Sequence, residues 1–244
     1  MNVREFLRRS ETFVGLARDA RKLSAIPRRL AQIRRRQRLV DGYLRAHAVR
    51  RLHLGAGPAL LEGWLNTDLV PATPGIAHLD ATRPFPLPAA SFDVAYCEHM
   101  IEHLAPAGGL IMLRECRRVL RPGGTVRVAT PDLEVFLGLY GREDDLRRRR
   151  YVQWVSDRYL RGGGAGKASL VINNLFRGWG HQFLYDAELL EGALAAAGFE
   201  RVRRVRPGES ANELLRGIES HGKVVRDEEM AAFETLVLEA DRPA

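Results

Sequence analysis

From residue 50 onward, short apolar runs alternate with amphipathic segments. Five of the runs are predicted as strands: Leu52–Leu54, Trp64–Thr67, Ile76–Leu79, Phe92–Cys97 and Thr125–Ala129. Before the fifth run, apolar residues at helical spacing predict a helix over about Ala107 to Leu120. The helix should end at Arg121-Pro122-Gly123-Gly124, which is a stop-and-turn signal. Strands that alternate with helices indicate the α/β class, with a parallel, doubly wound sheet.

The second half of the chain interrupts this rhythm and then returns to it. Residues 133–160 read as one helix, with Asp144/Arg148 and Asp145/Arg149 spaced to pair, and residues 135–185 as a helical lid insertion. The glycine run from Gly162 lacks the residues of a phosphate-binding loop and is interpreted as a mobile lid or hinge. The last elements predicted are a helix over 186–197, a strand over 199–205, a helix over 227–232 and a strand over 233–239. The final strand should run antiparallel, at or near one edge of the sheet.

The N-terminal residues 1–48 are predicted to form a basic helical arm, separate from a main domain over 49–244. Of the 38 Lys and Arg residues, 14 lie in residues 1–50, which hold only 4 of the 30 Asp and Glu residues. The remainder is therefore close to neutral, which argues against a nucleic-acid groove in the main domain. The arm is suited to touch anionic lipid or an acidic partner, and it is equally suited to be a solvated face packed on its own domain.

Bulk composition points to an ordinary globular protein. The chain has 244 residues, 45% of them hydrophobic and 28% charged, and only two cysteines, Cys97 and Cys116. Their apolar surroundings predict buried thiols in a reducing compartment. No stretch of the sequence approaches the length of a membrane span or an apolar signal peptide, so a cytoplasmic location is expected.

Two glycines break the first predicted strand, and an aspartate ends the second. Gly55-Ala56-Gly57 directly follows Leu54, and Asp68 follows Asn66-Thr67. Glycines at a strand end let the backbone turn tightly and approach a ligand, because no Cβ stands in the way. An acid at the end of the next strand can accept hydrogen bonds from ribose hydroxyls. These residues predict a nucleotide-type cofactor cradle.

Several motifs, in order and at plausible spacing, carry a family resemblance. They are Leu52–Gly57, Gly63–Leu69, Leu79–Ala81, Phe92–Val94, Glu98–Leu104 and Leu120–Gly124. The set resembles class I S-adenosylmethionine-dependent methyltransferases and, more narrowly, their methyltransferase-11-type branch. The resemblance implies a Rossmann-like, doubly wound, mostly parallel seven-stranded sheet with an antiparallel last strand. It also implies S-adenosyl-L-methionine as cofactor.

The resemblance assigns cofactor roles residue by residue. The glycine turn would pass beneath the methionine and ribose, Asp68 would accept from the ribose hydroxyls, and Glu98 would border the methionine. The implied cofactor-binding residues are Leu54, Gly55, Ala56, Gly57, Asp68, Leu69, Asp80, Ala81 and Glu98. A turn or helix-cap acid is the alternative role for Asp80. His53 stands where the family often has an acid.

Methylation of a hydroxyl needs a group that removes its proton, usually a histidine or a carboxylate. His99 directly follows the fourth strand, and His181 lies after the lid, where acceptor pockets of this family form. Both are therefore predicted catalytic residues, ahead of His103. The acceptor is expected to be a small molecule or a saccharide, since some members of the branch modify saccharides.

Two alternatives stay open at this stage. His99-Met100-Ile101-Glu102-His103 matches the inverted zinc-peptidase motif, which would make the protein a zinc hydrolase with both histidines on one helix face. The other is a catalytically weak methyltransferase fold that docks partners through its arm. The preferred interpretation assigns no metal ligand.

Overall fold

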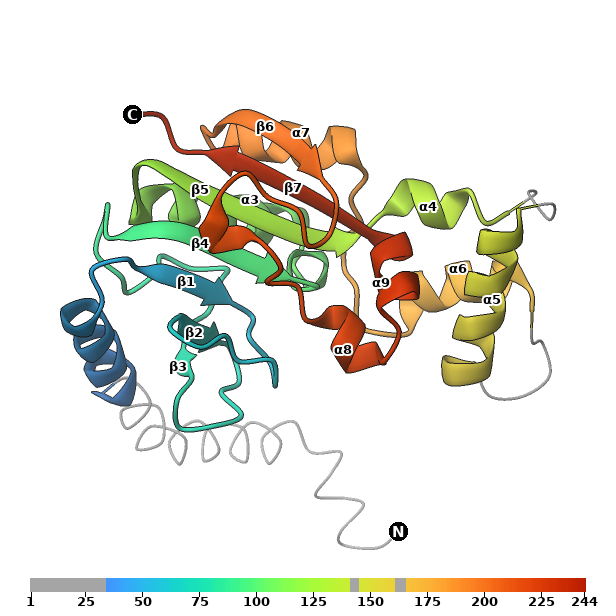
Figure 1. Cartoon of the computed structure of the whole chain (residues 1–244), viewed down its shortest axis with the longest axis horizontal. Helices are drawn as coiled ribbons and strands as arrows, with labels where there is room; N and C mark the ends of the chain where they lie inside the picture. The colour runs from blue at the N-terminus through green and yellow to red at the C-terminus, as the bar shows by residue number, and fades with distance from the viewer. Residues whose placement is uncertain (1–33, 141–144, 161–165) are drawn as a thin grey trace, which may run out of the picture.

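The computed structural model describes residues 34–140, 145–160 and 166–244, and a seven-stranded sheet forms its centre (Figure 1). The strands follow the order β3-β2-β1-β4-β5-β7-β6, and β7 runs antiparallel to both of its neighbours. Their bounds are β1 Arg51–Leu54, β2 Leu65–Asp68, β3 Ala77–His78, β4 Phe92–Glu98, β5 Leu120–Pro131, β6 Glu200–Val205 and β7 Thr235–Asp241. The predicted Rossmann-like sheet with an antiparallel last strand is confirmed.

Apart from the helix of residues 34–46, the helices gather in two places around the sheet (Figure 1). Two of them pack on the sheet, where their apolar residues join the main core: α3 Pro106–Val119 and α7 Ala187–Ala196. The others lie beyond the carboxyl ends of the parallel strands: α4 Leu133–Leu137, α5 Leu146–Tyr159, α6 Ala168–Arg177, α8 His221–Val225 and α9 Glu228–Glu234. Two short 3-10 turns complete the set, η1 Ile101–His103 and η2 Glu213–Leu215.

Helix α3 shows how the sequence pattern becomes structure. Pro106 occupies the first turn, where its missing N–H has no intrahelical partner to lose. Met112, Leu113 and Cys116 recur at helical spacing and are fully buried against the sheet. The strand that follows begins earlier than predicted, because Arg121–Gly124 is part of β5 rather than a separate turn. Gly123 has a φ of +77°, so the irregularity is absorbed within the strand.

The first strand connections contain fewer helices than the alternating pattern implies. Residues 55–64 join β1 to β2 without a helix. The sheet face near Trp64 and Tyr96 is instead covered by Leu215, from the segment that follows β6. This covering segment, residues 206–222, is held by Arg127, whose guanidinium donates to the main-chain oxygen of Glu209 at 2.9 Å. A segment from late in the chain therefore covers the first strands of the sheet.

The predicted helix over 133–160 is wrong, because two helices take its place. Helix α4 ends at Leu137 and is capped by Gly138, and α5 begins after Asp145. The Asp145 carboxylate accepts hydrogen bonds from the main-chain nitrogens of Arg147 and Arg148. It also pairs with the Arg148 side chain at 3.1 Å, so this acid caps a new helix instead of bracing a continuous one.

These helices have a core of their own, which includes Phe136, Tyr151, Val155 and Leu175. These four residues lie within residues 135–185, and it stays a prediction that this segment is an insertion that acts as a lid. The glycine run of residues 161–165 and the predicted partner Asp144 lie outside the described residues.

The end of the chain is shifted from the prediction by two residues. Phe233 and Glu234 close helix α9, and β7 begins at Thr235. The shift matters because Glu234 is buried at the helix end, at the same sheet edge as His99. A strand conformation from 233 would have placed this carboxylate in the sheet ladder.

Most of the predicted arm lies outside the described residues, but residues 34–46 are helical. Val40 and Tyr43 are buried in the main core, and the Tyr43 hydroxyl donates to the main-chain oxygens of Arg51 and Gly63. This part of the arm is therefore packed on its own domain. Within the described residues, none of the helices combines the length and apolar composition that crossing a membrane requires.

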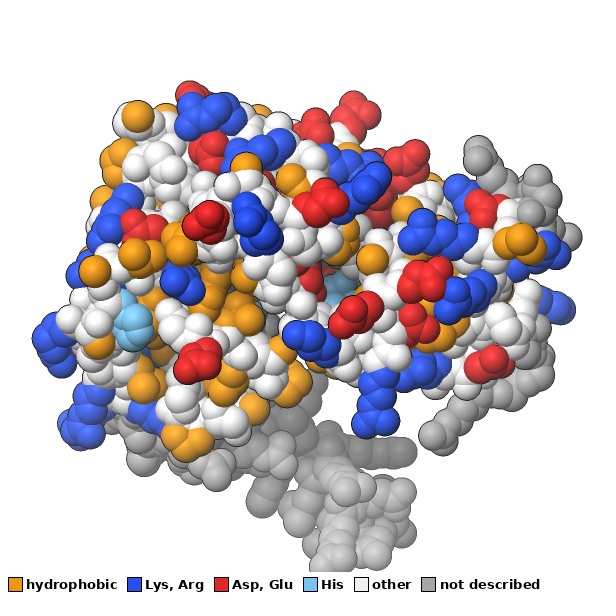
Figure 2. All heavy atoms as spheres, in the orientation of Figure 1, with side chains coloured by type: hydrophobic (Ala, Val, Ile, Leu, Met, Phe, Trp, Pro, Cys, Tyr) orange, Lys and Arg blue, Asp and Glu red, His pale blue; other side chains and the backbone are white. Residues whose placement is uncertain are grey.

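The main domain shows mixed charge on the face seen in Figure 2, where basic and acidic side chains are interspersed. Ion pairs contribute to this mixing, as between Arg150 and Glu229 at 2.6 Å and between Arg203 and Asp241 at 2.9 Å. The arrangement agrees with the near-neutral composition of this domain.

Candidate active site

The glycine turn after β1 has the backbone conformation that the sequence predicts. Gly55 has a φ of +67° and Gly57 a φ of +49°. A Cβ on Gly55 would lie 2.9 Å from Met100 Cβ and overlap Cγ of the same side chain. A Cβ on Gly57 would meet nothing within 4 Å, so this residue borders open space. The turn is tight on one side and open on the other, as a ligand cradle requires.

Asp68 ties this turn to the end of β2. Its Oδ2 accepts a hydrogen bond from the Gly57 nitrogen at 2.9 Å, and its Oδ1 accepts one from the Val70 nitrogen at 2.7 Å. Leu69, between Asp68 and Val70, is 58% exposed. Leu54 is buried in β1, and Ala56 donates from its nitrogen to the Thr67 oxygen at 3.0 Å.

Asp80 stabilises a turn of its own. Its Oδ1 accepts from both the nitrogen and the hydroxyl of Thr82, at 3.0 and 2.6 Å, and Arg83 lies 3.1 Å from Oδ2. The hydrogen bond from Thr82 is the main reason that the pKa of Asp80 is lowered. Its contacts match the turn-acid alternative, and Ala81 lies inside that turn.

Glu98, the last residue of β4, is bound by the covering segment. Its carboxylate accepts from the nitrogen and hydroxyl of Ser220, at 2.9 and 2.7 Å, and from the His221 nitrogen at 3.0 Å. This predicted cofactor residue therefore positions the segment over the sheet edge.

A cavity of about 240 Å³ opens directly beyond β4 and β5. We call it the histidine pocket, because four imidazoles and two carboxylates line it together with aromatic side chains. Its polar lining consists of His99, Glu102, His103, His181, His221 and Glu234. Both predicted catalytic histidines, His99 and His181, are thus brought into one cavity from positions far apart in the chain.

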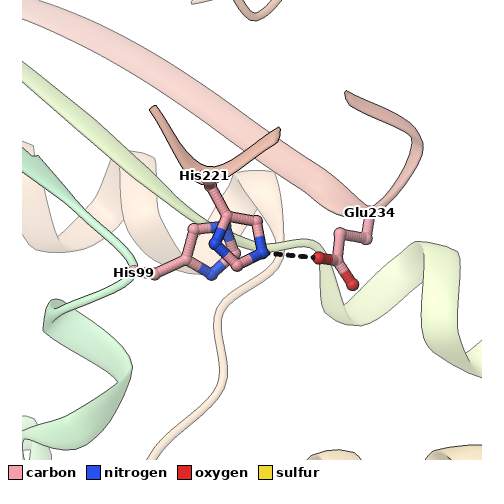
Figure 3. A group of neighbouring side chains, drawn as sticks. All are labelled: His99, His221 and Glu234. Carbon is pink, nitrogen blue, oxygen red and sulfur yellow. Dashed lines mark hydrogen bonds and ion pairs between the residues drawn. The ribbon is translucent and has the colours of Figure 1, made fainter. Parts of the chain in front are cut away.

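His99 has a strained backbone conformation directly after the carboxyl end of β4. Its φ of +46° is uncommon for a residue with a Cβ, and such conformations concentrate at functional sites. Its ring stacks on His221, with centroids 3.7 Å apart, and His221 Nε2 lies 3.0 Å from Glu234 Oε1 (Figure 3). Burial disfavours a charged His99, but the carboxylates around it, Glu102 first, outweigh burial and raise its pKa.

Glu102 is a fully buried carboxylate between two groups of histidines. Its Oε2 accepts from the Thr130 hydroxyl at 3.1 Å, and its Oε1 lies 3.4 Å from His99 Nδ1. Burial alone would raise the pKa of Glu102, but the contact with His99 outweighs it and the pKa is lowered.

His103 and His181 face each other on the other side of Glu102. Their ring centroids lie 5.0 Å apart with the planes at 70°, and His181 Nδ1 is 2.7 Å from the main-chain oxygen of Leu175. Burial lowers the pKa of His181, which favours the neutral ring.

The zinc-peptidase alternative requires His99 and His103 on one face of a helix. In the structure His99 precedes the helix in a left-handed conformation, and η1 spans only Ile101–His103. The required arrangement is therefore not formed. Glu234 and His221, which also line the pocket, are not among the site residues that the sequence predicts.

Residues 62–128 match a family whose description is Methyltransferase domain. The matched residues include the last part of the cradle, β4 and those residues of the histidine pocket that come first along the chain. The order of the strands in the sheet fits the same fold. Over these residues, therefore, the chain is similar to class I methyltransferases. No curated protein matches it.

Several solved structures resemble this chain. A SAM-dependent methyltransferase from Archaeoglobus fulgidus is 19% identical, with 88% of this chain and 94% of that chain covered and a TM-score of 0.47. One from Mesorhizobium loti is 20% identical, with 82% and 95% covered and a TM-score of 0.45. Phosphoethanolamine N-methyltransferase 2 of Haemonchus contortus is 14% identical, with a TM-score of 0.46. The alignment covers 80% of this chain but only 49% of the Haemonchus chain.

S-adenosylmethionine is the methyl donor of this class, and the cradle of this chain fits it. Gly57 borders open space, and Asp68 lies beside it with carboxylate oxygens at the end of β2. His53, the departure from the family pattern, is buried and bonded through Nδ1 to Asn66 Oδ1 at 2.9 Å. Burial lowers the pKa of His53, which favours a neutral ring in the core.

Proposed function

We propose that this methyltransferase moves the methyl group of S-adenosylmethionine to a hydroxyl oxygen of a small molecule, with saccharides as the favoured class. The histidine pocket is the observation that carries the proposal. It concentrates four imidazoles and two carboxylates in one cavity, at the sheet edge where the cradle also lies. A hydroxyl must lose its proton during transfer, and these are the side chains that accept protons near neutral pH.

The step itself is an in-line displacement. The acceptor oxygen bonds to the methyl carbon as the carbon–sulfur bond breaks, and the electron pair of that bond remains on sulfur as a neutral thioether. The hydroxyl proton passes to an imidazole, for which His99 and His181 are the proposed acceptors. Holding both reactants in line supplies several kcal/mol of the rate enhancement by proximity.

Aromatic side chains support a saccharide or similar ring in this pocket. Trp154, Tyr159 and Trp179 form part of its wall, and Tyr159 and Trp179 meet edge to face with centroids 5.4 Å apart. Apolar walls with a few convergent polar groups are typical of sites for small organic ligands. They also exclude water from the reacting atoms.

A cytoplasmic location is part of the proposal. Cys97 and Cys116 are both buried free thiols, as expected in a reducing compartment. For the basic arm, contact with an anionic membrane surface or an acidic partner is proposed only for the part that precedes residue 34.

Turnover with a panel of hydroxyl compounds tests the proposal, with production of S-adenosylhomocysteine as the readout. Trp179→Ala should raise the KM for the acceptor about tenfold or more, because it removes a pocket wall, while leaving calorimetric binding of S-adenosylhomocysteine unchanged. Exposed Leu170→Ala on α6 is the matched control and should change neither quantity. If an active substrate has the same KM with Trp179→Ala as with the wild type, the assignment of the histidine pocket as the acceptor site is contradicted.

A further inference from the structure

We propose that Glu102, His103 and His181 bind a divalent transition-metal ion in the wall of the histidine pocket. One ligand atom from each of the three side chains lies within 4.8 Å of the other two. Two imidazoles and one carboxylate are a common donor set for Zn²⁺, Fe²⁺, Co²⁺ and Mn²⁺. Glu102 and His103 come from η1 and His181 from the segment after α6, so the fold brings residues far apart in the sequence together at one point.

The strongest sign of a cation is a buried carboxylate oxygen without a hydrogen bond. Glu102 is fully buried, and among the described residues its Oε1 has no hydrogen-bond partner. Its other oxygen is fixed by Thr130, so the carboxylate cannot turn to relieve this. Buried carboxylates are normally paired, hydrogen-bonded or bound to metal, and the contact of Oε1 with His99 at 3.4 Å is long.

His181 is oriented as a metal ligand. Its Nδ1 lies 2.7 Å from the main-chain oxygen of Leu175, which assigns the proton to Nδ1 and leaves the lone pair on Nε2. A carbonyl that holds the far nitrogen is the usual support of a metal-binding histidine. The rings of His103 and His181 meet at 70°, so lone pairs in the two ring planes can converge.

A neighbouring group, His99 with His221 and Glu234, has the same residue types but a different geometry (Figure 3). Its two rings are stacked at 25°, so their lone pairs lie in nearly parallel planes and do not converge. His221 and Glu234 are also bonded to each other, and the remaining carboxylate oxygen accepts from the Tyr151 hydroxyl. This group therefore stabilises the wall of the pocket, and the cation site is assigned to Glu102, His103 and His181.

The three ligands leave coordination positions open toward the cavity. A cation with open positions lowers the pKa of a hydroxyl that reaches it and fixes the orientation of that hydroxyl. This consequence rests on the proposed function, because it makes the acceptor an alcohol or a vicinal diol. With its Nε2 on the ion, His181 does not accept the hydroxyl proton, and that role falls to His99 alone. Binding of the ion does not depend on this consequence.

Cobalt binding to the full chain, after dialysis against a chelator, tests the site. Co²⁺ held by nitrogen and oxygen ligands gives visible absorption, and we expect a saturable signal in the wild type. Glu102→Gln and His181→Gln should weaken Co²⁺ binding about tenfold or more. His47→Gln is the matched control, because His47 Nδ1 also contacts a main-chain oxygen, that of Tyr43 at 3.1 Å, and should bind as the wild type does.

His221→Gln separates the two groups and should also retain the signal. Absence of a signal in the wild type, its survival in His181→Gln, or its loss in His221→Gln would overturn the proposal. Calorimetric binding of S-adenosylhomocysteine to each variant establishes that it is folded. Metal binding without any methylated hydroxyl product would contradict the proposed function and leave the metal site standing.

Discussion

The Glu98 carboxylate binds Ser220, a residue 122 positions later in the chain, through both the nitrogen and the hydroxyl of that residue. The contact joins the carboxyl end of β4 to the covering segment, residues 206–222. The next residue on each side, His99 and His221, is stacked ring on ring in the histidine pocket. One pair of residues therefore fixes both the cover over the first strands and one wall of the pocket.

Glu98→Gln should lower the free energy of unfolding by about 1–3 kcal/mol, because it replaces a charged acceptor that receives several hydrogen bonds. Urea unfolding at neutral pH measures the change. Glu62→Gln, at an exposed position in the loop before β2, is the matched control and should stay within about 0.5 kcal/mol of the wild type. Equal stability of the two variants would mean that Glu98 does not hold the covering segment.

Gly55→Ala should abolish cofactor binding or reduce it strongly, because a Cβ there overlaps Met100 and the φ of +67° is strained. Adding Met100→Ala should restore part of the affinity, since it removes the overlap with Cγ but leaves the close contact with Cβ and the strain. Calorimetric titration with S-adenosylhomocysteine measures both. Gly42→Ala, in the helix of residues 34–46 with free space around it, is the control and should bind normally. Undiminished binding by Gly55→Ala would contradict the described turn.

The cradle was predictable because its signals are local. The two glycines with positive φ lie next to Ala56, and the acid at the end of the next strand follows Gly57 by only 11 residues, so the turn needs no distant partner. The mostly parallel sheet with an antiparallel last strand was also predictable, from the succession of strands and from the motifs that resemble class I methyltransferases. Only the structure shows that the connection between β1 and β2 contains no helix.

The histidine pocket could be predicted only in part, because its members meet through tertiary contacts. His99 and His181 were placed near the acceptor by their positions after a strand and after the helical insertion. Glu234 was missed because a pattern of apolar residues from Phe233 predicts a strand, whereas α9 continues through both residues. Orientation is a further limit: nothing in the sequence indicates that Leu175 holds Nδ1 of His181.

Asp241 makes stability depend on pH at the acidic end. Burial alone would raise its pKa, but hydrogen bonds from Arg203, Thr125 and Arg201 outweigh it and lower the pKa below the ordinary value. The stabilisation is therefore present above the unfolded pKa of about 4 and is lost as pH falls toward the lower folded value.

We expect Asp241→Asn to lower the free energy of unfolding by about 1–2 kcal/mol at pH 7, and the difference from the wild type to shrink at about pH 3. Asp157→Asn, on an exposed face of α5, is the control. A difference that stays constant or grows on acidification would show that the charge of Asp241 is not what stabilises the pairing of β5, β6 and β7.

The atom that receives the methyl group tests the central claim most directly. The protein, S-adenosylmethionine with a ¹³C-labelled methyl group and an active hydroxyl substrate are incubated, and the product is examined by NMR. The account predicts a methyl ether, formed about 100-fold or more slowly by His99→Gln. A label on nitrogen or carbon, or a wild-type rate in His99→Gln, would contradict hydroxyl methylation in the histidine pocket.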